Sequence, residues 1–101
     1  MSQDWVNREN ELFIKVKNIV NKWDMYTLLV MGAPENEYED EIIDILNRCS
    51  FVYSIKSMII NLKSIFGYWS SEKFTDENFE GMAEELVELF ITENNKNWYI
   101  D

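Results

Sequence analysis

Residues 23–41 decide the fold, and they read Trp23-Asp24-Met25-Tyr26-Thr27-Leu28-Leu29-Val30-Met31-Gly32-Ala33-Pro34-Glu35-Asn36-Glu37-Tyr38-Glu39-Asp40-Glu41. Asp24 is a good helix N-cap, because its carboxylate can accept the free backbone N–H groups of the next turn. We predict a short helix over residues 25–31, ended by Gly32, which tolerates the left-handed backbone of a helix stop. Pro34 keeps that helix from continuing. The stretch therefore predicts a Gly-Ala-Pro corner between two helices.

Another helix start follows this corner directly. Asn36 can cap the new helix, and Glu39, three residues later, can complete a capping box. Several acids lie in or near the first turn, where negative charge meets the positive end of the helix dipole. We predict a helix over residues 37–48.

The corner resembles a motif of the YugE-like family, which comprises small, uncharacterised bacterial helical proteins. The matching positions are Trp23, Asp24, Leu28, Leu29, Gly32, Ala33, Pro34, Glu37, Tyr38 and Glu41. Many relatives have Pro in place of Met25 and Asp in place of Asn36, and both departures are mild. The motif covers residues 23–41, and the helix pattern beyond it is compatible but less specific. The resemblance implies a compact all-helical domain and no particular activity.

Apolar side chains with helical spacing predict further helices on both sides of the corner. The first is clear over residues 12–23, and Asp4 can cap a start at Trp5. After the corner, Ser50 or Ser54 can cap a helix that we expect to end at Gly67.

Thr75 is the expected N-cap of the last helix. The predicted fold is a compact bundle of four to five helices, of which the second is short. We expect one domain over residues 1–101, in which residues 1–8 and 94–101 are looser termini.

Composition narrows the location and the partners. The chain has 101 residues, a formal net charge of −10, no His and a single Cys. A lone Cys cannot form an intrachain disulfide, which suits a reducing compartment, and no apolar run approaches the ~18 residues of a membrane span. We expect a cytoplasmic protein with no membrane association and no direct contact with nucleic acid, whose phosphates would repel it.

The acids are concentrated in two segments. Residues 25–47 carry six acids and no base, and residues 76–101 carry eight acids and one base. The predicted partner-binding face consists of Glu37, Glu41, Asp44, Glu77, Glu80, Glu84 and Glu88. If the two helices that carry these acids lie side by side, they form one acidic surface.

The sequence offers little for catalysis. Nucleophilic triads and zinc sites rely on His or on several Cys residues, and Cys49 is more simply a small core residue. Carboxylates one helical turn apart, such as Glu37 and Glu41, can bind Mg²⁺ or Ca²⁺, although a solvated acidic face explains them more simply. We predict no catalytic residue, no metal and no cofactor.

The aromatic residues divide into two groups. Trp23 and Tyr38 flank the corner and are expected to support it from within. Trp69, Trp98 and Tyr99 lie in segments predicted to be non-helical, where large aromatics either cover the core or anchor an interface. The sequence leaves the oligomeric state undecided between a monomer and a homodimer that uses these aromatics.

Three functions remain in competition. The first is a non-enzymatic module, of the immunity, inhibitor or small adaptor type, that binds a basic protein through its acidic helices. The second is a nucleic-acid mimic whose carboxylates imitate phosphates and occupy a DNA-binding protein. The third is a carboxylate-based metal-binding or enzymatic protein that uses Glu37, Glu41 and Asp44.

Overall fold

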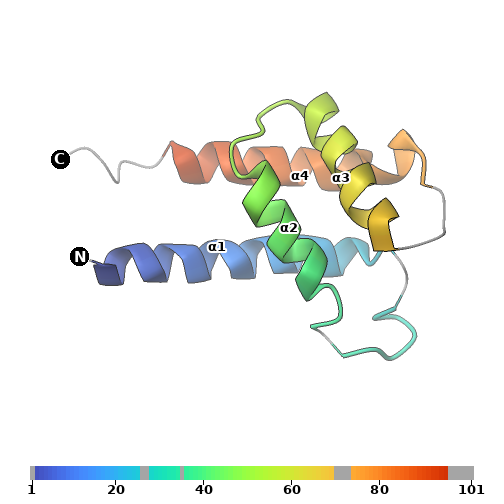
Figure 1. Cartoon of the computed structure of the whole chain (residues 1–101), viewed down its shortest axis with the longest axis horizontal. Coiled ribbons are helices and arrows are strands. Elements are labelled where there is room, and N and C mark those ends of the chain that lie inside the picture. Colours follow the sequence, from blue (N-terminus) through green and yellow to red (C-terminus); the bar gives the residue numbers. More distant parts are fainter. Residues whose placement is uncertain (1, 26–27, 35, 70–73, 96–101) are drawn as a thin grey trace.

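Four helices form the part of the chain that the computed structural model describes, which comprises residues 2–25, 28–34, 36–69 and 74–95 (Figure 1). They are α1 (Ser2–Trp23), α2 (Glu39–Cys49), α3 (Ile55–Trp69) and α4 (Asp76–Asn94). No strand occurs in these ranges. The predicted all-helical fold is therefore confirmed, with four helices.

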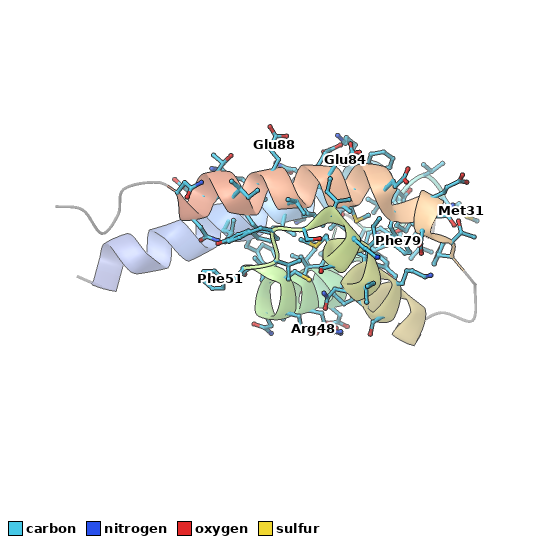
Figure 2. All side chains as sticks on the ribbon, turned by 90° about the horizontal axis from the view of Figure 1, so that it is seen from above. Met31, Arg48, Phe51, Phe79, Glu84 and Glu88 are labelled. Carbon is cyan, nitrogen blue, oxygen red and sulfur yellow. The ribbon has the colours of Figure 1, made fainter. Side chains whose placement is uncertain are left out.

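The helices form two layers. α1 and α4 run antiparallel in one layer, and α2 and α3 cross them in the other (Figures 1 and 2). α1 packs against α2 and α4, and α3 also packs against α2 and α4. Within the described residues the backbones of α2 and α4 do not pack side by side, and Asn94 of α4 donates to the carbonyl of Ser50, the residue after α2, at 2.8 Å.

The core lies where the two layers meet, and it consists of the apolar stripes that the periodicity indicates. Val16 and Val20 of α1 are fully buried, together with residues of the other three helices. These are Ile42, Ile45, Cys49, Met58, Leu62, Phe66, Phe79, Met82, Ala83, Leu86 and Phe90. Phe66 and Phe79 join α3 to α4 through tilted rings whose centroids are 5.7 Å apart.

Two predicted caps are confirmed. Thr75 forms a capping box at the start of α4, although Asn78 rather than an acid completes it. Ser54 rather than Ser50 caps α3, since its Oγ accepts the N–H of Ser57 at 3.3 Å. The last helix therefore begins where the sequence indicates.

The short second helix is not an α-helix in the part that is described, residues 28–34, which forms hydrogen-bonded turns. Two helical turns are too few to be stable alone, so tertiary contacts decide the outcome. Gly32 does adopt a left-handed φ of 102°, and the N–H of Ala33 donates to the carbonyl of Leu28. This pattern is that of a helix C-terminal stop without a full helix before it.

Three expected helix boundaries are wrong. α1 begins at Ser2, before the cap expected at Asp4. α2 begins at Glu39 after a turn in which the backbone carbonyl of Asn36, rather than its side chain, accepts a hydrogen bond. Gly67 lies inside α3, because burial of Ile65 and Phe66 favours continuing that helix.

The Asp24 carboxylate connects the end of α1 to the start of α2. It accepts backbone N–H groups from Leu29 at 3.1 Å and from Val30 at 3.0 Å. The buried hydroxyl of Tyr38 donates to it at 2.5 Å. Asp24 is only 7% exposed and has a left-handed φ of 45°, so three segments are joined by one buried acid.

Burial alone would raise the pKa of Asp24, but the hydrogen bonds from Tyr38, Leu29, Val30 and Leu28 outweigh it. The pKa of Asp24 therefore lies below its ordinary value of 3.8. A depressed carboxyl pKa contributes stability that is present above 3.8 and is lost as the pH falls through the folded-state value.

Replacing Asp24 with Asn should lower the free energy of unfolding at neutral pH by about 2–3 kcal/mol, because the charged acceptor of these hydrogen bonds is lost. Tyr38→Phe removes one bond and leaves the carboxylate, so it should cost about 1 kcal/mol. Urea unfolding at neutral and acidic pH measures both. Asp24→Asn should also flatten the loss of stability in acid, and equal losses in the two variants would contradict this role of the charge.

Trp23 fixes the distance between α1 and α4. A Cβ added to Gly81 would overlap the Trp23 ring, so only glycine fits there in this arrangement. The indole Nε1 donates to Glu85 at 3.2 Å, which holds the ring over α4. Trp23 thus supports the α1–α4 layer and not, as expected, the interior of the corner.

Gly81→Ala should destabilise the protein by about 1 kcal/mol, because displacing the Trp23 ring outweighs the better helix propensity of alanine. Gly67→Ala is the matched control. An added Cβ meets nothing within 4 Å there, so it should stabilise α3 by about 0.5–1 kcal/mol. Thermal unfolding compares the two, and a stabilising Gly81→Ala would refute the close contact.

Candidate partner-binding surface

Four carboxylates form a ridge along the solvent side of α4. All four side chains are exposed, and they are Glu77, Glu80, Glu84 and Glu88. Glu84 and Glu88 point away from α2 and α3 (Figure 2). Since an α-helix rises 1.5 Å per residue, successive acids from Glu80 onward lie about 6 Å apart along the axis. We call these four residues the acidic ridge.

Two other acids of α4 are directed to α1 and are neutralised there. Glu85 forms an ion pair with Lys22 Nζ at 2.6 Å, and Glu93 forms one with Lys15 Nζ at 2.6 Å. Among the described side chains, no base pairs with the acidic ridge in this way. The ridge therefore keeps its full negative charge on the surface.

The acidic residues of α2 and the segment before it lie elsewhere. Glu37 is exposed, Asp44 is half-buried, and Glu41 is only 6% exposed. Because the backbones of α2 and α4 do not pack side by side within the described residues, the condition for one shared acidic surface is not met. The α4 ridge is the longer exposed series of carboxylates.

Burial is the main cause that raises the pKa of Glu41 above its ordinary value. A hydrogen bond to its own backbone N–H opposes the shift, and the charges of Asp40, Asp44 and Glu37 add to it. A raised carboxyl pKa means that the ionised form destabilises the fold, so stability falls as the pH rises through the folded-state value. Glu41 is therefore a poor partner-binding residue in the folded chain.

Glu41→Gln should raise the free energy of unfolding at neutral pH by roughly 0.5 kcal/mol, because it removes a buried charge and its repulsion from acids one turn away. Glu39→Gln is the control, since this acid is exposed and is not among the charges that act on Glu41. Chemical denaturation measures both. A destabilised Glu41→Gln would show that the carboxylate makes a favourable contact.

The remaining predicted residues are placed as follows. Tyr38 is buried as expected, whereas Trp23 is 39% exposed, and Pro34 is exposed on the turn before α2. Trp98 and Tyr99 lie outside the described residues, as does the side chain of Trp69. Their use as interface anchors stays a prediction.

The sequence reasoning missed the residues that bind α1 to α4. Lys15 and Lys22 are seven residues apart, and Glu85 and Glu93 are eight apart, so each pair lies on one helix face. That spacing was visible in the sequence. The pairing of these lysines with these acids, which lie more than 60 residues apart in the sequence, was not.

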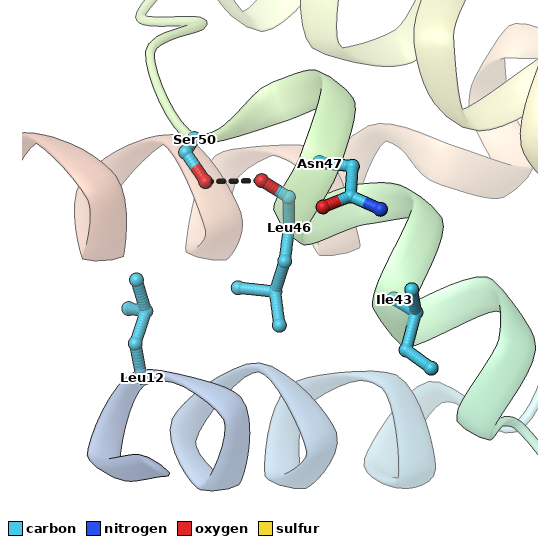
Figure 3. Close-up of a pocket in the computed structure, with 5 residues that line it drawn as sticks. All are labelled: Leu12, Ile43, Leu46, Asn47 and Ser50. Atoms are coloured by element: carbon cyan, nitrogen blue, oxygen red, sulfur yellow. Dashed lines mark hydrogen bonds between the residues drawn. The ribbon is translucent and has the colours of Figure 1, made fainter. Parts of the chain in front are cut away.

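A small pocket of about 200 Å³ lies between α1 and α2 (Figure 3). Leu12, Ile43 and Leu46 form its apolar walls, with Asn47 and Ser50 beside them. The Ser50 hydroxyl donates to the carbonyl of Leu46, so it is already engaged (Figure 3). The lining contains no titratable side chain.

Metal and thiol chemistry find little support in the described part of the chain. No three His, Cys, Asp or Glu side chains converge there as a metal site would require. Cys49 is fully buried in the core, as expected, and burial raises its pKa to about 11. At neutral pH its thiol is protonated and unreactive.

No helix within the described ranges is long and apolar enough to cross a membrane. Comparisons of the chain with protein-family models, with curated proteins and with solved structures find no match.

Proposed function

We propose that this protein is a non-enzymatic interaction module that binds a basic protein through the acidic ridge of α4. The observation that carries the proposal is the ridge itself, in which four exposed carboxylates follow one another along one side of a helix. The neighbouring acids Glu85 and Glu93 are paired with lysines, so they add little to the outward charge.

The physical setting favours recognition of a positive surface. α4 is rigid, because its N-terminus is capped and its opposite side is buried in the core. A preformed row of charge steers a basic partner during diffusion and restricts which partners fit. Such contacts are exposed, so salt should screen them.

Three further features belong to the same proposal. The corner motif supports membership of the YugE-like family and a role of Gly32-Ala33-Pro34 in directing the chain into α2. The lone Cys49 supports a cytoplasmic location. Glu37 and Asp44 lie on a different element from the ridge and form a secondary acidic region.

A nucleic-acid mimic is the second candidate, and the spacing of the ridge favours it. Acids about 6 Å apart along the helix axis are close to ~7 Å, which is the length of two rise steps along one DNA strand. The two functions differ in one observable. Free DNA should compete for the partner of a mimic and should not compete for a partner that recognises only this protein.

The test is retention of partners from a native lysate by the immobilised full chain, at low salt and at ~0.5 M salt, read by mass spectrometry. We expect a basic protein at low salt that is lost at the higher salt. Glu80→Lys/Glu84→Lys/Glu88→Lys should abolish its retention by replacing attraction with repulsion.

Glu37→Lys/Glu39→Lys/Asp40→Lys is the matched control, since it changes net charge equally at other exposed acids. It should retain the partner. Loss in the control alone would move the interface to the start of α2. A partner that is insensitive to salt and to both variants, or no basic partner at all, would overturn the proposal.

A further inference from the structure

A groove of about 420 Å³ follows the seam between α1 and α4. Ile19 and Leu89, both half-buried, provide its apolar part, and Glu88 of the acidic ridge belongs to its lining. Glu88 points away from the α2–α3 layer (Figure 2), so the groove adjoins the acidic ridge.

Ion pairs fix two of the lining acids. Lys15 binds Glu93, which is only 3% exposed, and Lys22 binds Glu85. These pairs satisfy two acids and two lysines and join α1 to α4. Glu88 has no such base among the described side chains, so the lining keeps one uncompensated negative charge beside an apolar surface.

Trp23 extends the same seam. Its ring contacts α4 at Gly81 and its Nε1 donates to Glu85, which also lines the groove. Lys22 Nζ lies 5.7 Å from the ring centroid, so a cation of this chain already occupies a position beside the ring. The α1–α4 seam therefore carries an exposed indole, an aliphatic surface and Glu88, a carboxylate with no basic partner among the described side chains.

We propose that the α1–α4 groove binds a long cationic side chain, arginine or lysine, from an extended basic segment of the partner. This inference rests on the proposed function, and it adds an apolar contact to the charge contacts of the ridge. The aliphatic stem would lie on Ile19 and Leu89 while the cation meets Glu88. Such side chains bury their methylene groups on apolar surface and keep the charge near water, and the groove matches both parts.

The probe is hexa-lysine, compared with a hexamer of 2,4-diaminobutyric acid, which has the same ammonium groups on shorter stems. Both are titrated into the ¹⁵N-labelled full chain at low salt. We expect hexa-lysine to bind about fivefold more tightly, since only its stems reach the apolar part of the groove. Amide shifts should concentrate at Ile19, Leu89 and the Trp23 indole.

Leu89→Ser should remove that fivefold preference, whereas Leu12→Ser should preserve it. Leu12 is a matched control, because it is a half-buried leucine in the separate pocket between α1 and α2. Ile19→Thr repeats the test from the α1 side, and circular dichroism verifies that each variant is folded. If the preference survives in both Leu89→Ser and Ile19→Thr, the proposal that the groove binds the cationic side chain is overturned.

A further variant separates this inference from the ridge. Glu77→Lys/Glu80→Lys removes ridge charge and leaves the groove lining intact. If it weakens both peptides equally while Leu89→Ser changes neither, the ridge binds basic chains and the groove does not. If neither peptide binds the wild-type chain at low salt, the groove and the ridge both fail.

Discussion

The structure depends on one buried carboxylate. Asp24 receives the backbone N–H groups of the turn after α1 and the hydroxyl of Tyr38 before α2, so it fixes how the chain passes from one layer to the other. Its left-handed backbone is unusual outside glycine and carries a cost, which these hydrogen bonds offset. Because Tyr38 also lies near Phe66, with ring centroids 6.4 Å apart, the polar node continues directly into the aromatic core.

The sequence was most informative where one periodic pattern decided the outcome. In each helix, apolar residues recur at helical spacing, and buried examples are Val16, Ile42, Leu62 and Phe79. Burying these stripes leaves few alternatives to helices packed face to face. Local signals failed where they competed with packing. Gly67 is a reasonable helix stop by itself, yet α3 continues to Trp69 because a glycine can also occupy a helix interior at a modest cost.

The sequence predicted which acids of α4 belong to the candidate site, but only part of their arrangement in space. The acids of α4 could be placed on its solvent side, since they lie opposite the apolar stripe that includes Leu86. Which acids remain free could not be derived, because that depends on lysines of α1 more than 60 residues away. For the same reason the sequence could not exclude Glu41, whose burial follows from the packing of α2 against α1 and α3.

The two-layer arrangement explains why recognition would use one side of the molecule. α2 and α3 cover the core from one side, so the described structural contacts on the opposite side of the α1–α4 layer are those of its seam, namely the ion pairs and the packing of Trp23 on Gly81. Exposed pairs such as Lys22–Glu85 add little stability, but they join the two helices across the seam. Beside the acidic ridge, which has no basic partner among the described side chains, the seam holds a groove of mixed polar and apolar lining, and its apolar part offers a contact that charge alone does not supply.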